Sequence, residues 1–308
     1  MISMRSIPAR LGRLGLVVGL LGGLAAGAGA APTALRWKFT PGETVRYESM
    51  QTTQTKVKEA GGQNLDNTLT LTMDLTWKVG AVDPRGVATI VQTIDRIRTT
   101  ATVPNGKLSF DSKESGDAAG PAGPLFKMLV GAEFTFKIDP QGELSDIKLA
   151  DKLLATLKGD DQPLGAQGQF SEAGLKNMLV QMGVVLPAKE INPGDTWSRK
   201  LAIPAGINGE TREVEQVYTL AAPAGGDRPL EPVDMATKFG PPPVDPNVPI
   251  TVNKQEATGR FQFDNAAGRI DTSRVVERVD LTVKIQDKEI NQVAETITVM
   301  TLRRDKNP

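Results

Sequence analysis

The chain has 308 residues, and its 36 basic residues balance 36 acidic ones. It contains neither cysteine nor histidine. These absences exclude disulfides, Ser-His-Asp triads, Cys-His dyads and histidine zinc sites, because each needs a thiol or an imidazole. The even charge argues against a nucleic-acid-binding protein, which would carry a basic face. We therefore expect no metal, no cofactor and no nucleic acid as a partner.

The N-terminus has the pattern of a cleavable signal peptide. Three arginines lie within the first thirteen residues, and an apolar run from Leu14 to Ala26 follows before a stretch of small residues. This order is typical of secretory signals, and the run is shorter than the roughly twenty residues of a membrane-spanning helix. We predict cleavage of residues 1–30 after Ala30. The remaining chain has 33 basic and 36 acidic residues, and we expect a periplasmic or extracellular protein with no transmembrane segment after processing.

The first part of the mature chain predicts antiparallel strands. Segment 35–39 alternates apolar and basic residues, and Pro41-Gly42 predicts a turn into a strand over 45–57. Segment 68–79 has the clearest alternation, because every odd position is apolar and every even position is polar. A period of two predicts a strand with one dry and one wet face. In the next strand, over 87–103, the alternation slips around Ile94 and Ile97, which predicts a β-bulge.

The middle of the chain predicts three helices. A short helix follows Pro124, a hairpin follows over 133–142, and an amphipathic helix over 147–157 comes next. A third helix is predicted from Ser171 as its N-cap to Gly183 as a left-handed C-terminal residue.

After Pro187 the sequence returns to strand patterns. Residues 192–197 repeat the Pro-Gly-acid-Thr pattern of residues 40–45, which raises the alternative that two halves, 35–160 and 187–303, are related. Residues 221–249 hold eight prolines and predict a long surface loop with polyproline character. Two long hairpins over 251–302 complete the chain.

Strands, then helices, then strands are typical of an α+β fold. We predict one domain over residues 31–308, with a large curved antiparallel sheet shaped like a half-barrel. About three helices would cover its apolar face. Apolar side chains between sheet and helices would line a ligand groove if the space is not filled. The candidate lining residues are Leu71, Met73, Leu75, Trp77, Met128, Met178 and Met182.

Four segments carry a resemblance to a known family: LRWKFTPGETVRYE at 35–48, FTFKIDPQGELSDI at 134–147, LPAKEINPGDTWS at 186–198 and GRFQFDNAAGRI at 259–270. Together they resemble an uncharacterised family of exported bacterial envelope proteins, known as a domain of unknown function. The segments are turns and strand edges, so the resemblance implies a fold and no site residues. The order of strands and helices is also similar to the half-barrel of periplasmic lipoprotein carriers, as a likeness of fold alone.

Three functions are compatible with these patterns. The first is a non-enzymatic envelope protein that binds a hydrophobic ligand, such as an acyl chain, or a partner protein. The second is a structural or interaction domain with a fully packed core. The third is a carboxylate-dependent hydrolase of envelope polysaccharide, which requires two acids about 5 to 9 Å apart in a cleft.

Overall fold

The fold was analysed in a computed structural model, which describes residues 32–59, 64–103, 106–114, 123–158, 171–204, 211–223, 228–242, 250–285 and 288–304. All of these residues belong to one compact unit, Pro32–Pro308. The predicted signal peptide and its cleavage site after Ala30 lie outside the described residues. Within them, no helix is long and apolar enough to cross a membrane.

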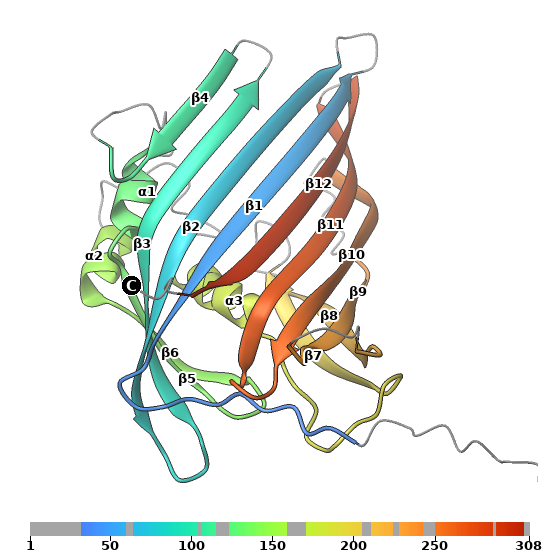
Figure 1. The fold of residues 1–308 in the computed structure, drawn as a ribbon. Coiled ribbons are helices and arrows are strands. Elements are labelled where there is room, and N and C mark those ends of the chain that lie inside the picture. Colours follow the sequence, from blue (N-terminus) through green and yellow to red (C-terminus); the bar gives the residue numbers. More distant parts are fainter. Residues whose placement is uncertain are drawn as a thin grey trace, which may run out of the picture. The chain divides into compact units, whose positions relative to one another are not determined.

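The described residues of this unit form one antiparallel sheet and three helices (Figure 1), as the α+β prediction stated. The strands are β1 (Thr44–Glu59), β2 (Leu65–Val82), β3 (Ala88–Val103), β4 (Gly106–Asp111), β5 (Glu133–Ile138), β6 (Leu144–Leu149), β7 (Thr196–Pro204), β8 (Thr211–Leu220), β9 (Glu231–Phe239), β10 (Ile250–Asp264), β11 (Arg269–Ile285) and β12 (Lys288–Arg303). The helices are α1 (Gly123–Leu129), α2 (Asp151–Lys158) and α3 (Glu172–Met182).

The sheet is open, with β6 and β7 at its two ends. Its strand order is β6-β5-β3-β2-β1-β12-β11-β10-β9-β8-β7, and β4 pairs with β3 outside this path. The first strand β1 therefore lies beside the last strand β12, and they pair from Arg46–Arg303 to Glu59–Ile290. This pairing makes the N-terminal and C-terminal strands neighbours in the middle of the sheet (Figure 1).

The predicted bulge in β3 is confirmed. Asp74 of β2 pairs with Arg96, whereas Leu75 pairs with Ile94, so Asp95 is the extra residue. The inserted residue returns both Ile94 and Ile97 to the buried side of the sheet, which explains why the alternation slips there. The Thr76 hydroxyl donates to the Asp95 carboxylate at 2.5 Å and so holds the bulged residue on the opposite side.

Two predictions about helix ends were wrong. The second helix begins at Asp151, because the backbone of Leu149 pairs with Phe134 and completes β6. Ser171 caps α3 as predicted, since its hydroxyl accepts from the Gly174 amide at 3.1 Å. Gly183, however, has a negative φ of −64°. The Gly183 amide donates to the Leu179 and Val180 carbonyls, and the Arg199 guanidinium binds the carbonyls of Val180 and Gly183. The helix end is thus satisfied without a left-handed residue.

Segment 35–39 is not a strand, contrary to the prediction. Its alternation does place Leu35 and Trp37 in the core. Its backbone nevertheless crosses two hairpin turns: the Trp37 amide donates to Pro140 at 2.9 Å and the Lys38 amide to Gly268 at 3.0 Å. Because these partners belong to separate turns, the segment is extended but forms no ladder.

The stretch 221–249 is not a single loop, because it contains β9, which lies between β8 and β10. Seven of its eight prolines lie before or after β9 in the sequence. The eighth, Pro232, is the second residue of β9 and precedes Val233, where the ladder with β8 begins. Proline is tolerated at a strand start because no ladder hydrogen bond is lost there.

Candidate functional site

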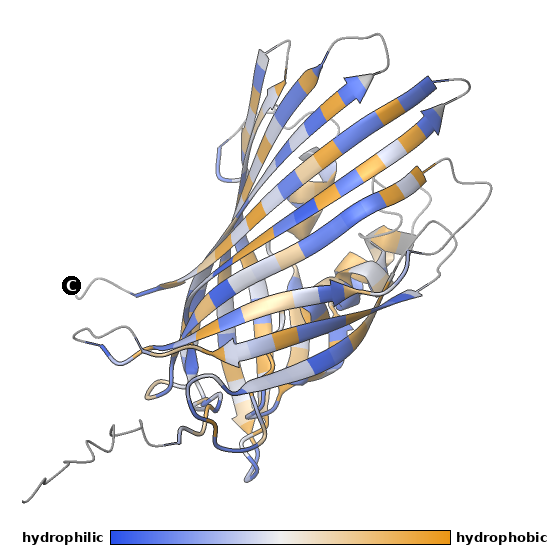
Figure 2. Cartoon of the chain, turned by 90° about the vertical axis from the view of Figure 1, so that its right-hand side faces the viewer, coloured by the Kyte–Doolittle hydropathy of each residue, from blue (hydrophilic) through white to orange (hydrophobic). Residues whose placement is uncertain are grey.

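The ladder registers divide the side chains of the sheet between two faces. We call the face on which the helices pack the inner face; Tyr47, Leu75 and Ile97 belong to it. The opposite side is the outer face. Figure 2 shows the apolar and polar residues that alternate along the strands, which is the pattern expected when the two faces differ in polarity.

Two buried clusters close part of the inner face. In the first, leucines of all three helices pack on β1–β6: Leu125, Leu129, Leu153, Leu157, Leu175 and Leu179. The second lies under segment 35–39 and the strands β8–β10, and includes Trp37, Tyr218 and Phe263. The predicted helical cover of an apolar face is therefore present over part of the sheet.

The structure brings six of the seven candidate lining residues to the first cluster. Leu75 is buried, and Leu71, Met73, Trp77, Met128 and Met178 are partly buried against it. Met182, at the end of α3, remains 43% exposed. Trp77 lies in the part of the inner face that the buried clusters cover. Its indole N–H donates to the buried Gln92 at 2.7 Å, and its ring packs edge-on against that of Tyr47, with 5.3 Å between the ring centres.

Beyond the helices, the inner face continues without the cover of either cluster. We call this part the open inner face: on β1, β2 and β10–β12 it comprises Gln51, Thr53, Leu69, Val252, Val275, Glu277, Val279, Leu281, Thr296 and Thr298. Leu69 is 47% exposed, and the other residues of the set are half-buried. Apart from Glu277, whose carboxylate accepts from the Gln255 amide at 2.8 Å, the side chains of this set are uncharged, and they remain in partial contact with solvent.

One row of paired residues crosses the open inner face from the first cluster, at Leu71, to the second, at Met235 and Tyr218. It crosses seven strands through Leu71, Gln51, Thr298, Val275, Gly259, Met235 and Tyr218 and contains no charged residue. Of this row, only Leu71 of β2 was predicted from the sequence as a candidate lining residue. The regular alternation of Val279, Leu281 and Val283 in β11 is the signal that could have added the C-terminal strands.

Arg199 is one of the few charged residues on the inner face. It is only 9% exposed. Its Nε donates to Gln216 at 2.7 Å, and its Nη2 donates to Val180 at 3.1 Å and to Gly183. These bonds join β7 and β8 to the C-terminal end of α3, where the partial negative charge of the helix favours a cation. Arg199 therefore fixes α3 on the sheet.

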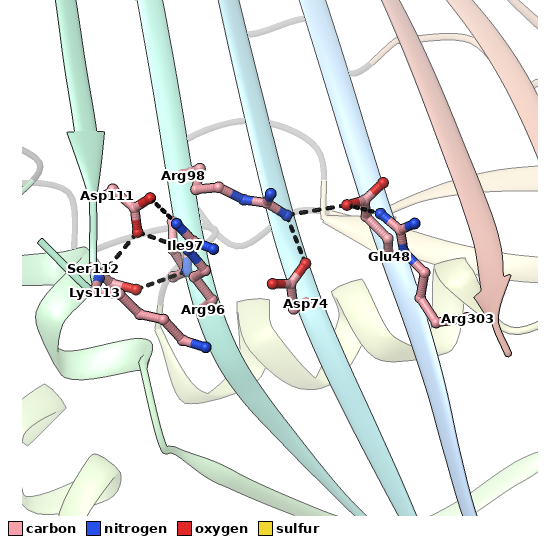
Figure 3. Close-up of polar contacts among 9 residues, drawn as sticks. All are labelled: Glu48, Asp74, Arg96, Ile97, Arg98, Asp111, Ser112, Lys113 and Arg303. Atoms are coloured by element: carbon pink, nitrogen blue, oxygen red, sulfur yellow. Dashed lines mark hydrogen bonds and ion pairs between the residues drawn. The ribbon is translucent and has the colours of Figure 1, made fainter. Parts of the chain in front are cut away.

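The outer face carries a chain of ion pairs across β3, β2, β1 and β12 (Figure 3). Arg98 binds Asp74 at 2.6 Å and Glu48 at 3.1 Å, and Arg303 also binds Glu48. Partial burial alone would raise the pKa of Glu48, but the hydrogen bonds from Arg303 and Arg98 outweigh it and lower that pKa. The charges of this face are thus matched across neighbouring strands.

A second ion pair on the same side joins β3 to β4. Arg96 binds Asp111 in two hydrogen bonds (Figure 3). The Arg96 bonds, followed by the Lys113 amide, lower the pKa of Asp111 to about 2. The pair anchors β4, whose ladder partner is β3 alone.

A pocket of about 300 Å³ lies where the start of β1, the end of β12 and the β10–β11 turn meet. Its lining is charged and includes none of the candidate groove residues. The lining residues are Thr44, Val45, Arg46, Arg228, Asp264, Ala267, Arg269, Leu302, Arg303 and Arg304. Carboxylates already bind its arginines; for example, Arg269 contacts Glu43 at 2.6 Å and Arg228 contacts Asp271 at 3.2 Å.

The hydrolase alternative requires an acid pair with one raised pKa. Glu48 and Asp74 both bind Arg98, but they lie on the outer face and neither lines the pocket. The lowered pKa of Glu48 is opposite to that of a general acid. Among the described residues, no group of three acids, histidines or cysteines could hold a metal ion.

Comparisons with known proteins bear on the family and the fold. Residues 85–230 match a family of unknown function, DUF6263, which confirms the resemblance to an uncharacterised family. A search of curated proteins gave no match. Two bacterial structures were found with low TM-scores. The translocator domain of autotransporter NalP from Neisseria meningitidis matches with a TM-score of 0.18 at 9% identity, and the match covers 85% of this chain and 89% of that chain. Ail, the attachment invasion locus protein of Yersinia pestis, matches with a TM-score of 0.15 at 6% identity, and the match covers 84% of this chain and 99% of that chain. These values are too low to indicate a shared fold.

The likeness to lipovitellin is stronger. A structure describing lipid–protein interactions in lipovitellin matches with a TM-score of 0.53 at 14% identity. The match covers 87% of this chain, which spans about a quarter (26%) of the lipovitellin chain. At this identity the comparison establishes a similar fold only, so the open antiparallel sheet of this protein is of a type also found in lipovitellin.

Proposed function

We propose that the protein binds the acyl chain of a lipid on its open inner face. The observation that carries the proposal is the row through Leu71, Gln51, Thr298 and Val275, which is uncharged and half-exposed. Its leucine and valine side chains offer apolar contact to a ligand, and burial of a methylene group contributes about 0.8 kcal/mol. An acyl chain laid along the row would gain this energy.

Two further points support a lipid as the ligand. First, most charged residues of these strands lie on the outer face, where Arg98 binds Asp74 and Glu48. The inner face of the same strands carries fewer charges, Glu277 among them, and this difference favours a lipid on the inner face. Second, lipovitellin, whose structure describes lipid–protein interactions, has a similar fold.

The proposal is tested with a pair of adjacent valines in β11. Val275 lies on the inner face opposite Thr298, and Val276 lies on the outer face opposite Ile297; both are half-buried. Val275→Asp and Val276→Asp have the same strand propensity cost. A carboxylate against an acyl chain is strongly unfavourable, so Val275→Asp should weaken binding of a fluorescent fatty acid at least about tenfold, which corresponds to about 1.4 kcal/mol.

Val276→Asp should leave the affinity unchanged within about twofold, a difference of roughly 0.4 kcal/mol. Equal weakening by both variants, or no saturable binding by the wild type, would contradict the proposal. Absence of binding would favour a fully packed structural domain instead.

The proposed site of action is outside the inner membrane. The N-terminal signal pattern supports export, and the mature chain would begin at Ala31. N-terminal sequencing of the protein expressed in a bacterial host, after separation of periplasm and medium from cytoplasm, tests this part. A mature form that retains residues 1–30 in the cytoplasm would contradict it.

A further inference from the structure

Arg212 lies on the inner face at one end of β8. It pairs with Ile203 of β7 and alternates with the buried Val214, so its side chain is on the same face as the apolar row. Its guanidinium carbon lies 5.1 Å from the centre of the Phe239 ring. Its Nε donates to the Gly240 carbonyl at 2.6 Å, and Nη1 donates to the Gln255 side chain at 2.5 Å. These contacts fix the guanidinium plane.

No carboxylate of the described chain binds this cation directly. Its partners are a carbonyl, an amide oxygen and an aromatic face, and Glu277 is reached only through Gln255, whose amide donates to it at 2.8 Å. The pKa of Arg212 is lowered because burial removes water from the charged form. Outer-face arginines differ: Arg260, for example, contacts Asp234 at 2.6 Å.

Within the described segments, Arg212 is thus a half-buried cation with no directly bound counter-charge, and such an arrangement is incomplete. Moving such a charge from water into a less polar setting costs free energy unless an anion compensates it. The guanidinium has five N–H donors, and two of them bond to residues that the structure describes. Its remaining donors form a fork of the geometry that carboxylates and phosphates accept.

The position of Arg212 relates it to the acyl-binding row. Gln255, its partner, pairs with Val279 of β11, and Val275 is four residues further along the same strand. Residues four apart in a strand are separated by about 13 Å. Glu277 lies between these two valines on the same face, and its carboxylate is held by the Gln255 amide. An acyl chain that leads from a headgroup at Arg212 along β11 towards Thr298 and Leu71 would therefore pass beside Glu277.

We propose that Arg212, held by Gln255 and Phe239, binds the oxyanion headgroup of a single-chain amphiphile whose acyl chain lies on the open inner face. This inference rests on the proposed acyl-binding function and adds the class of headgroup. Carboxylates and phosphate monoesters share the chemistry that the guanidinium recognises.

The test compares three probes with the same C16 chain: palmitate, methyl palmitate and 1-palmitoyl lysophosphatidic acid, each in competition with a neutral fluorescent acyl ester at pH 8. We expect the wild type to bind at least one of the two anions about tenfold more tightly than the ester, as a charge-assisted contact of about 1.4 kcal/mol predicts. Arg212→Gln should lose this preference while its affinity for methyl palmitate stays unchanged, which also shows that the variant is folded. Arg260→Gln, on the outer face, should keep the preference.

The outcomes separate the two proposals. A preference for palmitate alone or for the phosphate alone identifies the headgroup, and both support the inference. Equal binding of all three probes by the wild type, or a preference that persists in Arg212→Gln, overturns it and leaves the acyl-binding proposal intact. Failure to bind any of the probes overturns both.

Discussion

Two turn glycines allow the contribution of one close backbone contact to be measured. Gly42 and Gly142 both have positive φ, +82° and +92°. A methyl group on Gly42 would meet no atom within 4 Å, whereas on Gly142 it would lie 2.2 Å from the Val184 carbonyl oxygen and 2.6 Å from the Trp37 Nε1. The two sites share the backbone requirement and differ in the space around them.

The magnitudes follow from this difference. A left-handed conformation costs a residue with a Cβ about 1–2 kcal/mol, and this cost applies to both Gly42→Ala and Gly142→Ala. Only Gly142→Ala must also displace the Val184 backbone and the Trp37 indole, whose N–H donates to Val184 at 3.3 Å. Overpacking of this kind costs a further 1–3 kcal/mol, approximately. We expect losses of roughly 1–2 and 2–5 kcal/mol, respectively.

Urea unfolding followed by far-ultraviolet circular dichroism measures both free energies. The entropy that alanine removes from the unfolded chain is the same in the two variants and cancels in the comparison. Equal destabilisation of Gly42→Ala and Gly142→Ala would refute the reasoning, because it would mean that segment 35–39 does not pack against the turn at Gly142.

Three further predictions concern the core, the ion pairs and the helix anchor. Leu175 is 0% exposed, so Leu175→Ala should lower the free energy of unfolding by about 2–5 kcal/mol. Met182→Ala should change this free energy by less than about 0.5 kcal/mol. Similar urea midpoints of the two variants would contradict the placement of α3. The folded pKa of Asp111, about 2, is below its ordinary value of 3.8, so its ion pair stabilises the fold above pH 3.8 and this contribution disappears as the pH falls to 2. The stability gap between wild type and Asp111→Asn should therefore shrink between pH 5 and pH 2, and a constant gap would be inconsistent with the pair. Arg199→Met should lower the free energy of unfolding by about 1.5–3 kcal/mol, because the hydrogen bonds of the guanidinium are lost. Amide hydrogen exchange in α3 should also become faster. Unchanged exchange would show that Arg199 does not anchor the helix.

Residues with strong local patterns were predictable from the sequence. The six alternating residues of 69–79 define a strand with one dry face, and the slip at Ile94 and Ile97 locates a bulge. Ser171 identifies a helix start because capping is a local interaction. In each case the decisive contacts lie within a few residues of each other or in the adjacent strand.

Features that depend on distant partners were not predictable in this way. Segment 35–39 has a strand pattern, but its amides bind turns about 100 and 230 residues away in sequence. Gly183 has no left-handed conformation, and Arg199 from β7 binds the carbonyls of Val180 and Gly183 at this helix end. The prolines around β9 obscured a short strand whose pairing depends on β8 and β10.

The candidate site shows the same division. The sequence identified the β2 side of the inner face, including Leu71 and Met73. It could not show that β1 and β12 are neighbours, and this pairing joins Leu71 to Val275 in one row. Arg212 has no sequence signature at all, since its significance depends on Phe239 and Gln255 from other strands.

Photolabelling tests the central claim, that an acyl chain lies on the open inner face, most directly. The protein would be irradiated with a C16 fatty acid carrying a diazirine in the chain, and the labelled residues of β11 identified by mass spectrometry. We predict labels on Val275 and Val279, which face inward, and their loss with excess palmitate. Labels on the outward-facing Val276 and Arg278, or labelling that palmitate does not compete, would contradict the account.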